Sequence, residues 1–94
     1  MNSNKSISVI VNYYNPTASE LLRSMLDFVL ESIEAKTKLK LELIVSDGSG
    51  HLSDYISKKC EQRGWIYLCS DERIGFAQGY NRGAIKASGD YVVW

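Results

Sequence analysis

The sequence has few features of any class of protein other than small globular domains. It has one proline and two cysteines in 94 residues, and its eleven basic residues balance its eleven acidic ones. No charge excess therefore favours nucleic acid or an anionic membrane as a partner. The apolar run after the polar N-terminus, Ile7–Val11, is too short for a signal peptide or a membrane span. We expect one domain over residues 1–94 and a cytoplasmic location, with a membrane-associated parent protein as an open alternative.

The cysteine and histidine residues do not form a metal-binding pattern. Cys60 and Cys69 lack the spacing of metal ligands. Two interpretations of them stay open, namely buried free thiols, which suit a reducing cytoplasm, and a disulfide; we favour the thiols. His51 has no apparent partner and is interpreted as a surface loop residue.

Apolar segments alternate with helical ones along the chain. This alternation predicts an α/β fold with a parallel sheet of about four strands, right-handed crossovers and helices on both faces, as in Rossmann-like proteins. The expected strands are Ile7–Val11, Leu41–Val45, Trp65–Cys69 and Tyr91–Trp94.

Two helices are predicted from apolar periodicity. The first has the spacing of a capping box, with Thr17 as the cap and Glu20 reaching back. The second runs from about Leu52 to Arg63 and ends at Gly64. The expected buried residues are Leu21, Leu22, Met25, Leu26, Val29 and Ile33 in the first helix, and Leu52, Tyr55, Ile56 and Cys60 in the second.

The third helix is expected to have a face almost without side chains. Gly75, Gly79 and Gly83 recur every fourth residue, Ala87 continues the row, and Gly89 is expected to stop the helix. Such a face favours either tight packing on the sheet or close approach to a ligand. The spacing differs from the G-x-G-x-x-G dinucleotide pattern, so a nicotinamide cofactor is not indicated.

Three polar loops follow the first three strands. In parallel sheets, ligands bind beyond the carboxyl ends of the strands. The loops at that edge are Asn12–Asn15, Ser46–Gly50 and Ser70–Gly75. This arrangement is typical of a binding edge, although many kinds of protein have one.

Taken together, three blocks resemble the N-terminal half of a family-2 glycosyltransferase of the GT-A fold. They are Ser8–Asn15, Ile44–Ser49 and Gly75–Tyr91. The resemblance covers nearly the whole chain and implies a partial GT-A domain that binds the nucleotide part of a sugar donor. It also implies an inverting transfer of the sugar to a hydroxyl acceptor, with a nucleotide diphosphate sugar as the partner.

The resemblance also implies roles for five residues. Tyr14 would lie against the nucleotide base, with Asn12 at the adjacent strand end, and Asp47 would accept a hydrogen bond from the base imide. Arg73 and Gly75 would approach the ribose and diphosphate.

Each of these roles has a structural alternative. Tyr14 could instead pack on the first helix, Asp47 could form an ordinary Asx-turn, and Arg73 could be solvated. The family usually has a second acidic or amide residue where Ser46 stands, which leaves the register open by one. Asn81 and Asp90 are interpreted as structural.

The family's Asp-x-Asp metal motif would follow the strand that begins at Tyr91, and the sequence ends at Trp94. We therefore expect a truncated, inactive fragment with no catalytic or metal-binding residue and no bound metal, while the full-length enzyme would use Mg²⁺ or Mn²⁺. We also expect a homo-oligomer, because Tyr91–Trp94 should leave an exposed sheet edge. The alternatives are a non-catalytic, self-associating or interaction α/β module and a nucleotidyltransferase-like nucleotide-binding domain.

Overall fold

The computed structural model describes residues 5–94, which form seven elements in strict alternation. The strands are β1 (Ser6–Tyr13), β2 (Lys40–Asp47), β3 (Ile66–Cys69) and β4 (Tyr91–Val93). The helices are α1 (Glu20–Lys36), α2 (Asp54–Arg63) and α3 (Phe76–Lys86). The predicted order of strands and helices is confirmed.

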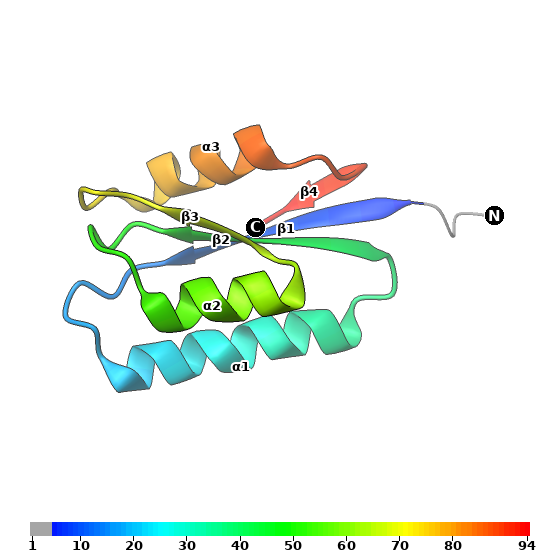
Figure 1. Ribbon diagram of the computed structural model, residues 1–94. Coiled ribbons are helices and arrows are strands. Elements are labelled where there is room, and N and C mark those ends of the chain that lie inside the picture. The colour runs from blue at the N-terminus through cyan, green and yellow to red at the C-terminus, as the bar shows by residue number, and fades with distance from the viewer. Residues whose placement is uncertain (1–4) are drawn as a thin grey trace.

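All strands are parallel, in the order β3-β2-β1-β4. Helix α3 covers one face of this sheet, and α1 and α2 cover the other (Figure 1). This is the Rossmann-like α/β fold that the sequence predicts. Because all strands run in the same direction, the loops after β1, β2 and β3 meet at one edge.

The main core lies between the sheet and helices α1 and α2. Alternate residues of the strands point into it, as the two-residue period of a strand requires. Its fully buried members include Leu30, Leu43 and Val45, with Ile56 and Cys60 from α2. Both cysteines are free thiols, as expected, but only Cys60 is buried and Cys69 is half-buried.

The glycine face of α3 packs directly on the sheet. A Cβ atom at Gly83 would lie 2.6 Å from Cγ2 of Ile10, and one at Gly79 would overlap the side chain of Asn12. Real Cβ atoms do not approach other atoms so closely. Of the two interpretations of this face, close packing on the sheet accounts for Gly79 and Gly83, whereas Gly75 has open space around it.

Ion pairs join α1 to α2 along their shared edge. Lys59 lies 3.0 Å from Asp27 and 2.8 Å from Glu31, and Arg63 lies 2.7 Å from Glu31 and 2.6 Å from Glu34. The two pairs of Arg63 are exposed, and pairs of that kind each contribute about 0–1 kcal/mol, whereas Lys59 and Asp27 are partly buried. Their placement turns the polar side of α1 toward α2.

The predicted start of α1 is wrong by two residues. Ser19 is the N-cap, and its hydroxyl accepts a hydrogen bond from the Leu22 amide. Thr17 is exposed in the preceding turn. A second serine, Ser53, caps α2 in the same way, so that helix begins at Asp54.

The predicted apolar face of α1 is only partly buried. Leu26 and Leu30 reach the core and Ile33 packs half-buried against it, whereas the remaining apolar side chains of this face are exposed. Leu52, which precedes α2, and Tyr55 in α2 are likewise exposed rather than buried. The exposed group of α1, called here the α1 apolar side, consists of Leu21, Leu22, Met25, Phe28 and Val29.

The prediction that Gly89 ends α3 is wrong. The helix ends at Lys86 with Ala87 as its C-cap, whereas Gly64 does end α2 in the left-handed conformation. Gly89 instead allows the chain to pass close to β1, where a Cβ atom would lie 2.7 Å from the Ser8 amide nitrogen.

Among residues 5–94, no helix combines the length and apolar character needed to cross a bilayer.

Candidate functional site

Three of the five residues that the sequence predicts for the donor site line one cavity at the carboxyl edge of the sheet. This donor cavity has a volume of about 380 Å³. Tyr14 comes from the loop after β1, while Arg73 and Gly75 come from the segment between β3 and α3. Its remaining lining residues are Ile74 and Phe76.

The N-terminus of α3 opens onto the donor cavity. Gly75 is its N-cap, and no side chain caps the first turn. Helix N-termini attract anions because their first amides lack internal partners. Arg73 is exposed, and no described carboxylate lies within ion-pair distance of it. The cavity therefore offers two aromatic rings, of Tyr14 and Phe76, and two kinds of donor for an anion.

Asn12 holds the start of α3 in place. Its Nδ2 donates a 3.0 Å hydrogen bond to the carbonyl of Phe76, and its side chain lies under Gly79. Asn12 is predicted as the first residue of the loop after the first strand, whereas in the structure it belongs to β1. Its contact with a nucleotide stays a prediction.

Asp47 is the last residue of β2 and is fully buried. Its Oδ1 accepts hydrogen bonds from the amide and hydroxyl of Ser49, at 3.0 and 2.5 Å. Its Oδ2 accepts a 2.6 Å hydrogen bond from the hydroxyl of Tyr67. The Ser49 amide contact is that of an Asx-turn, and the Asp47 side chain has no exposed surface on which a base imide could bind. The role of Asp47 in base binding stays a prediction.

Ser46, where the sequence departs from the family pattern, is also buried. Its Oγ has no hydrogen-bond partner among the described residues. Ser46 pairs with Asn12 in the β1–β2 register and is adjacent to Asp47 along the strand. Since neighbouring strand residues point to opposite faces, Ser46 lies on the α3 side and Asp47 on the α1 side.

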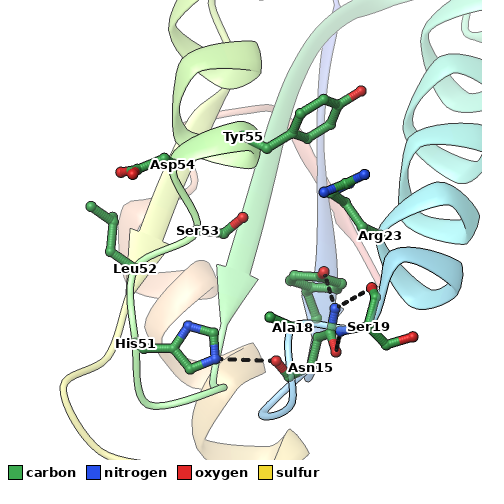
Figure 2. A pocket seen from close by; sticks show the side chains of 10 residues that line it. Asn15, Ala18, Ser19, Arg23, His51, Leu52, Ser53, Asp54 and Tyr55 are labelled. Carbon is green, nitrogen blue, oxygen red and sulfur yellow. Dashed lines mark hydrogen bonds between the residues drawn. The ribbon is translucent and has the colours of Figure 1, made fainter.

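A second cavity, of about 230 Å³, lies between α1 and α2 at the same edge of the sheet (Figure 2). Asn15, Ser19 and Arg23 line it from the α1 side, facing His51 and Tyr55 across the gap. The guanidinium carbon of Arg23 lies 4.6 Å from the centre of the Tyr55 ring. This cavity contains none of the five predicted site residues.

Asn15 anchors the loop after β1 and is nearly fully buried. Its Nδ2 donates to the hydroxyl of Tyr13 and to the Ser19 carbonyl, at 2.7 and 2.9 Å, and its Oδ1 accepts from the Ser19 amide. The Asn15 amide donates to Ser49 at 2.7 Å. His51 is an exposed loop residue, as expected, but it does have a partner, because its Nε2 lies 3.2 Å from the Asn15 carbonyl oxygen.

Four residues that form the hydrogen bonds around Asp47 and in the loop after β1 are not predicted from the sequence, namely Tyr13, Asn15, Ser49 and Tyr67. The available signal was the placement of polar residues directly after apolar strands, where buried groups need partners.

Burial, and then the hydrogen bond to Asp47, raise the pKa of Tyr67 above its ordinary value. Burial also raises the pKa of Tyr13, so both phenols are neutral donors or acceptors at physiological pH.

The resemblance implies a divalent cation, and the described residues do not provide a site for it. Within residues 5–94, no group of three or more His, Cys, Asp or Glu side chains could hold a metal ion. We therefore assign no metal ligand and derive no step through a metal.

Comparison with known proteins gives one match. No curated protein and no solved structure matches the chain significantly. The family model described as glycosyl transferase family 2 matches residues 8–94, which include all the donor-cavity residues and nearly the whole fold. This membership supports a general role in glycosyl transfer. The chain belongs to glycosyl transferase family 2.

Proposed function

We propose that the chain binds the nucleotide part of a nucleotide-sugar donor in the donor cavity, for an inverting transfer of the sugar to a hydroxyl acceptor. The observation that carries this proposal is the placement of Tyr14, Arg73 and Gly75 around one cavity of about 380 Å³. Family membership supports the same class of donor.

Each residue has a physical role in this proposal. The Tyr14 ring is exposed to 44% and can stack on a base, a contact worth about 1–3 kcal/mol. Arg73 offers charged N–H groups to the diphosphate. Gly75 brings the α3 amides close to phosphate oxygens without an intervening side chain. Asn12 would keep α3 in register with β1 during binding.

Calorimetric titration with uridine, thymidine and guanosine diphosphates tests this function. We expect weak binding of a pyrimidine nucleotide, and Tyr14→Ala should lower its affinity about tenfold because the stacking contact is lost. Tyr55→Ala is the matched control, because Tyr55 is exposed to 46% and lies on α2. The absence of binding at millimolar nucleotide, or equal effects of both variants, would contradict the proposal.

We also propose self-association, because a separate observation supports it. The four residues Tyr91–Trp94 are exposed at the β4 edge of the sheet. The α1 apolar side is exposed as well. An unpaired strand edge and a group of exposed apolar side chains are each typical of an interface.

A further inference from the structure

The segment Asp47–Ser49 supports the Tyr14 side of the donor cavity without lining it. The Gly48 amide donates a 2.9 Å hydrogen bond to the Tyr13 carbonyl. The Ser49 hydroxyl accepts a 2.7 Å hydrogen bond from the Asn15 amide. Tyr14 therefore lies between two residues that are both bonded to this segment.

The same segment supports the Arg73 side. The Ile74 amide donates a 3.1 Å hydrogen bond to the Gly48 carbonyl, and Ser49 forms a β-bridge with Arg73. A Cβ atom at Gly48 would lie 2.9 Å from the Ile74 carbonyl oxygen, so the two segments are in close contact. The distance between Tyr14 and Arg73 thus depends on the path of Asp47–Ser49.

The Asp47 carboxylate fixes that path through a directed chain of hydrogen bonds. The Asn15 amide donates to the Ser49 hydroxyl, which donates to Oδ1 of Asp47. From the other side, the Ser53 amide donates to the Tyr67 hydroxyl, which donates to Oδ2. A carboxylate only accepts and an amide only donates, so each hydroxyl has one possible direction. We call these five residues the Asp47 network.

Building on the donor-binding function proposed above, we propose that the hydroxyls of Ser49 and Tyr67 are positioning groups for nucleotide binding. They hold the Asp47 segment so that Tyr14 and Arg73 are already at the separation that a nucleoside diphosphate spans. A loop ordered in advance has less conformational freedom to lose on binding. Tyr67 is absent from the residues that line the donor cavity, so its effect on affinity is transmitted through Asp47 and the loop.

Tyr67→Phe tests this proposal with a closely matched control. In the wild type, Tyr67 donates to Oδ2 of Asp47 at 2.6 Å, and Tyr55 donates to Oδ2 of Asp27 at the same 2.6 Å. Tyr55→Phe therefore removes the same kind of bond from the α1–α2 surface. Circular dichroism would establish that both variants are folded under the conditions used, and Ser49→Ala replaces Tyr67→Phe if the latter does not fold.

Amide hydrogen exchange gives a readout that needs no ligand. Tyr67→Phe should accelerate exchange of the Asn15 and Ile74 amides about tenfold, because both lie on the segments that Asp47 holds. Tyr55→Phe should leave these two amides unchanged. Equal exchange in Tyr67→Phe and the wild type would overturn the proposal.

A double-mutant cycle with uridine diphosphate tests the link to binding. Tyr67→Phe should weaken binding about three- to tenfold, a size typical of residues that act through a network. In a Tyr14→Ala background the same substitution should have a smaller effect, because its influence passes through Tyr14. An undiminished effect in that background would overturn the transmission through Tyr14.

The two readouts separate this proposal from the donor-binding function. Faster exchange together with no nucleotide binding by the wild type would contradict the donor-binding function and support the positioning of the loops. Nucleotide binding that is unchanged by Tyr67→Phe would overturn the positioning role and support the donor-binding function.

Discussion

At the scale of single residues, polar side chains form hydrogen-bonded clusters at both ends of the sheet. At the amino end, Glu42 accepts hydrogen bonds from the hydroxyl of Ser8 at 2.6 Å and from the amide and hydroxyl of Ser88 at 2.8 and 2.9 Å. Ser8 in turn accepts from the Gly89 amide at 2.8 Å. One carboxylate thus joins β1, β2 and the chain after α3.

This arrangement predicts a pH-dependent contribution of Glu42 to stability. Burial acts to raise the pKa of Glu42, but the hydrogen bonds from Ser8 and Ser88 outweigh it, so the pKa lies below the ordinary value of 4.5. A lowered folded-state pKa stabilises fully above the unfolded pKa, and this stabilisation is lost as pH falls through the folded value. We expect Glu42→Gln to lower the free energy of unfolding by about 1–2 kcal/mol at pH 7 and by less at pH 3.

Urea unfolding at both pH values measures this difference. Glu61→Gln is the control, because Glu61 is an exposed residue of α2. A Glu42→Gln effect of the same size at pH 7 and pH 3 would show that the carboxylate charge is not responsible.

Cys60 should be chemically inert in the folded protein. Burial raises the pKa of its thiol to about 11, although the nearby Lys59 acts in the opposite direction. Since the thiolate is the nucleophile, a buried thiol with this pKa reacts slowly near neutral pH. In a Cys69→Ser variant, we expect Ellman's reagent to modify Cys60 at pH 8 only after urea unfolds the chain. Rapid modification without urea would contradict the burial of this thiol.

At the scale of elements, the sequence predicts the order and type of all seven, and it is less accurate on which faces are covered. The period of four in Gly75, Gly79 and Gly83 predicts the close approach of α3. The apolar period of α1 predicts a helix, but it also predicts the burial of Met25 and Val29, which are exposed, because periodicity does not show how wide the neighbouring layer is. Burial depends on contacts distant in sequence, which local patterns do not encode.

The candidate site divides in the same way. Tyr14, Arg73 and Gly75 lie around one cavity, as expected for loops at one edge of a parallel sheet. Asp47 and Tyr67 are 20 positions apart, and only the β2–β3 register brings them together. A single sequence does not give this register, so the Asp47 network could not be predicted.

The packing of α3 predicts a cost for the smallest added side chain. Gly83→Ala should lower the free energy of unfolding by up to about 2 kcal/mol, because overpacking against the buried Ile10 costs about 1–3 kcal/mol. The gain in helix propensity, about 1 kcal/mol, is smaller. Ala84→Gly, at an exposed neighbour, measures the propensity term separately by thermal or urea unfolding. A Gly83→Ala variant more stable than the wild type would show that the helix and sheet separate easily.

At the scale of the whole molecule, as described over residues 5–94, α1 has a neighbouring helix along one side only. Helix α2 and its ion pairs flank α1 on one side. The residues of the α1 apolar side are exposed, and α1 lies on the face of the sheet opposite α3 (Figure 1). Beyond β1, the sheet ends at β4. Antiparallel pairing of two β4 strands about a two-fold axis perpendicular to the sheet would place both α1 helices on the same face.

The proposed self-association predicts a dimer at micromolar concentration in sedimentation experiments. Phe28→Glu should convert it to a monomer, because Phe28 is exposed to 74% on the α1 apolar side and a charge there opposes burial. Ile85→Glu is the matched control, since Ile85 is exposed to 82% on α3. A folded monomeric wild type, or equal behaviour of the two variants, would contradict self-association through this surface.

The place of β1 in the sheet has a consequence during protein synthesis. This strand is made before the other three, and it gains β2 as its first neighbour. Its second neighbour is β4, and the contacts between Ser6 and Asp90 join positions 84 residues apart. At about 5–20 residues per second, a ribosome needs several seconds to cover that separation. Throughout that time at least one edge of β1, an interior strand of the finished sheet, has no partner, and an unpaired edge of this kind exposes the nascent chain to aggregation.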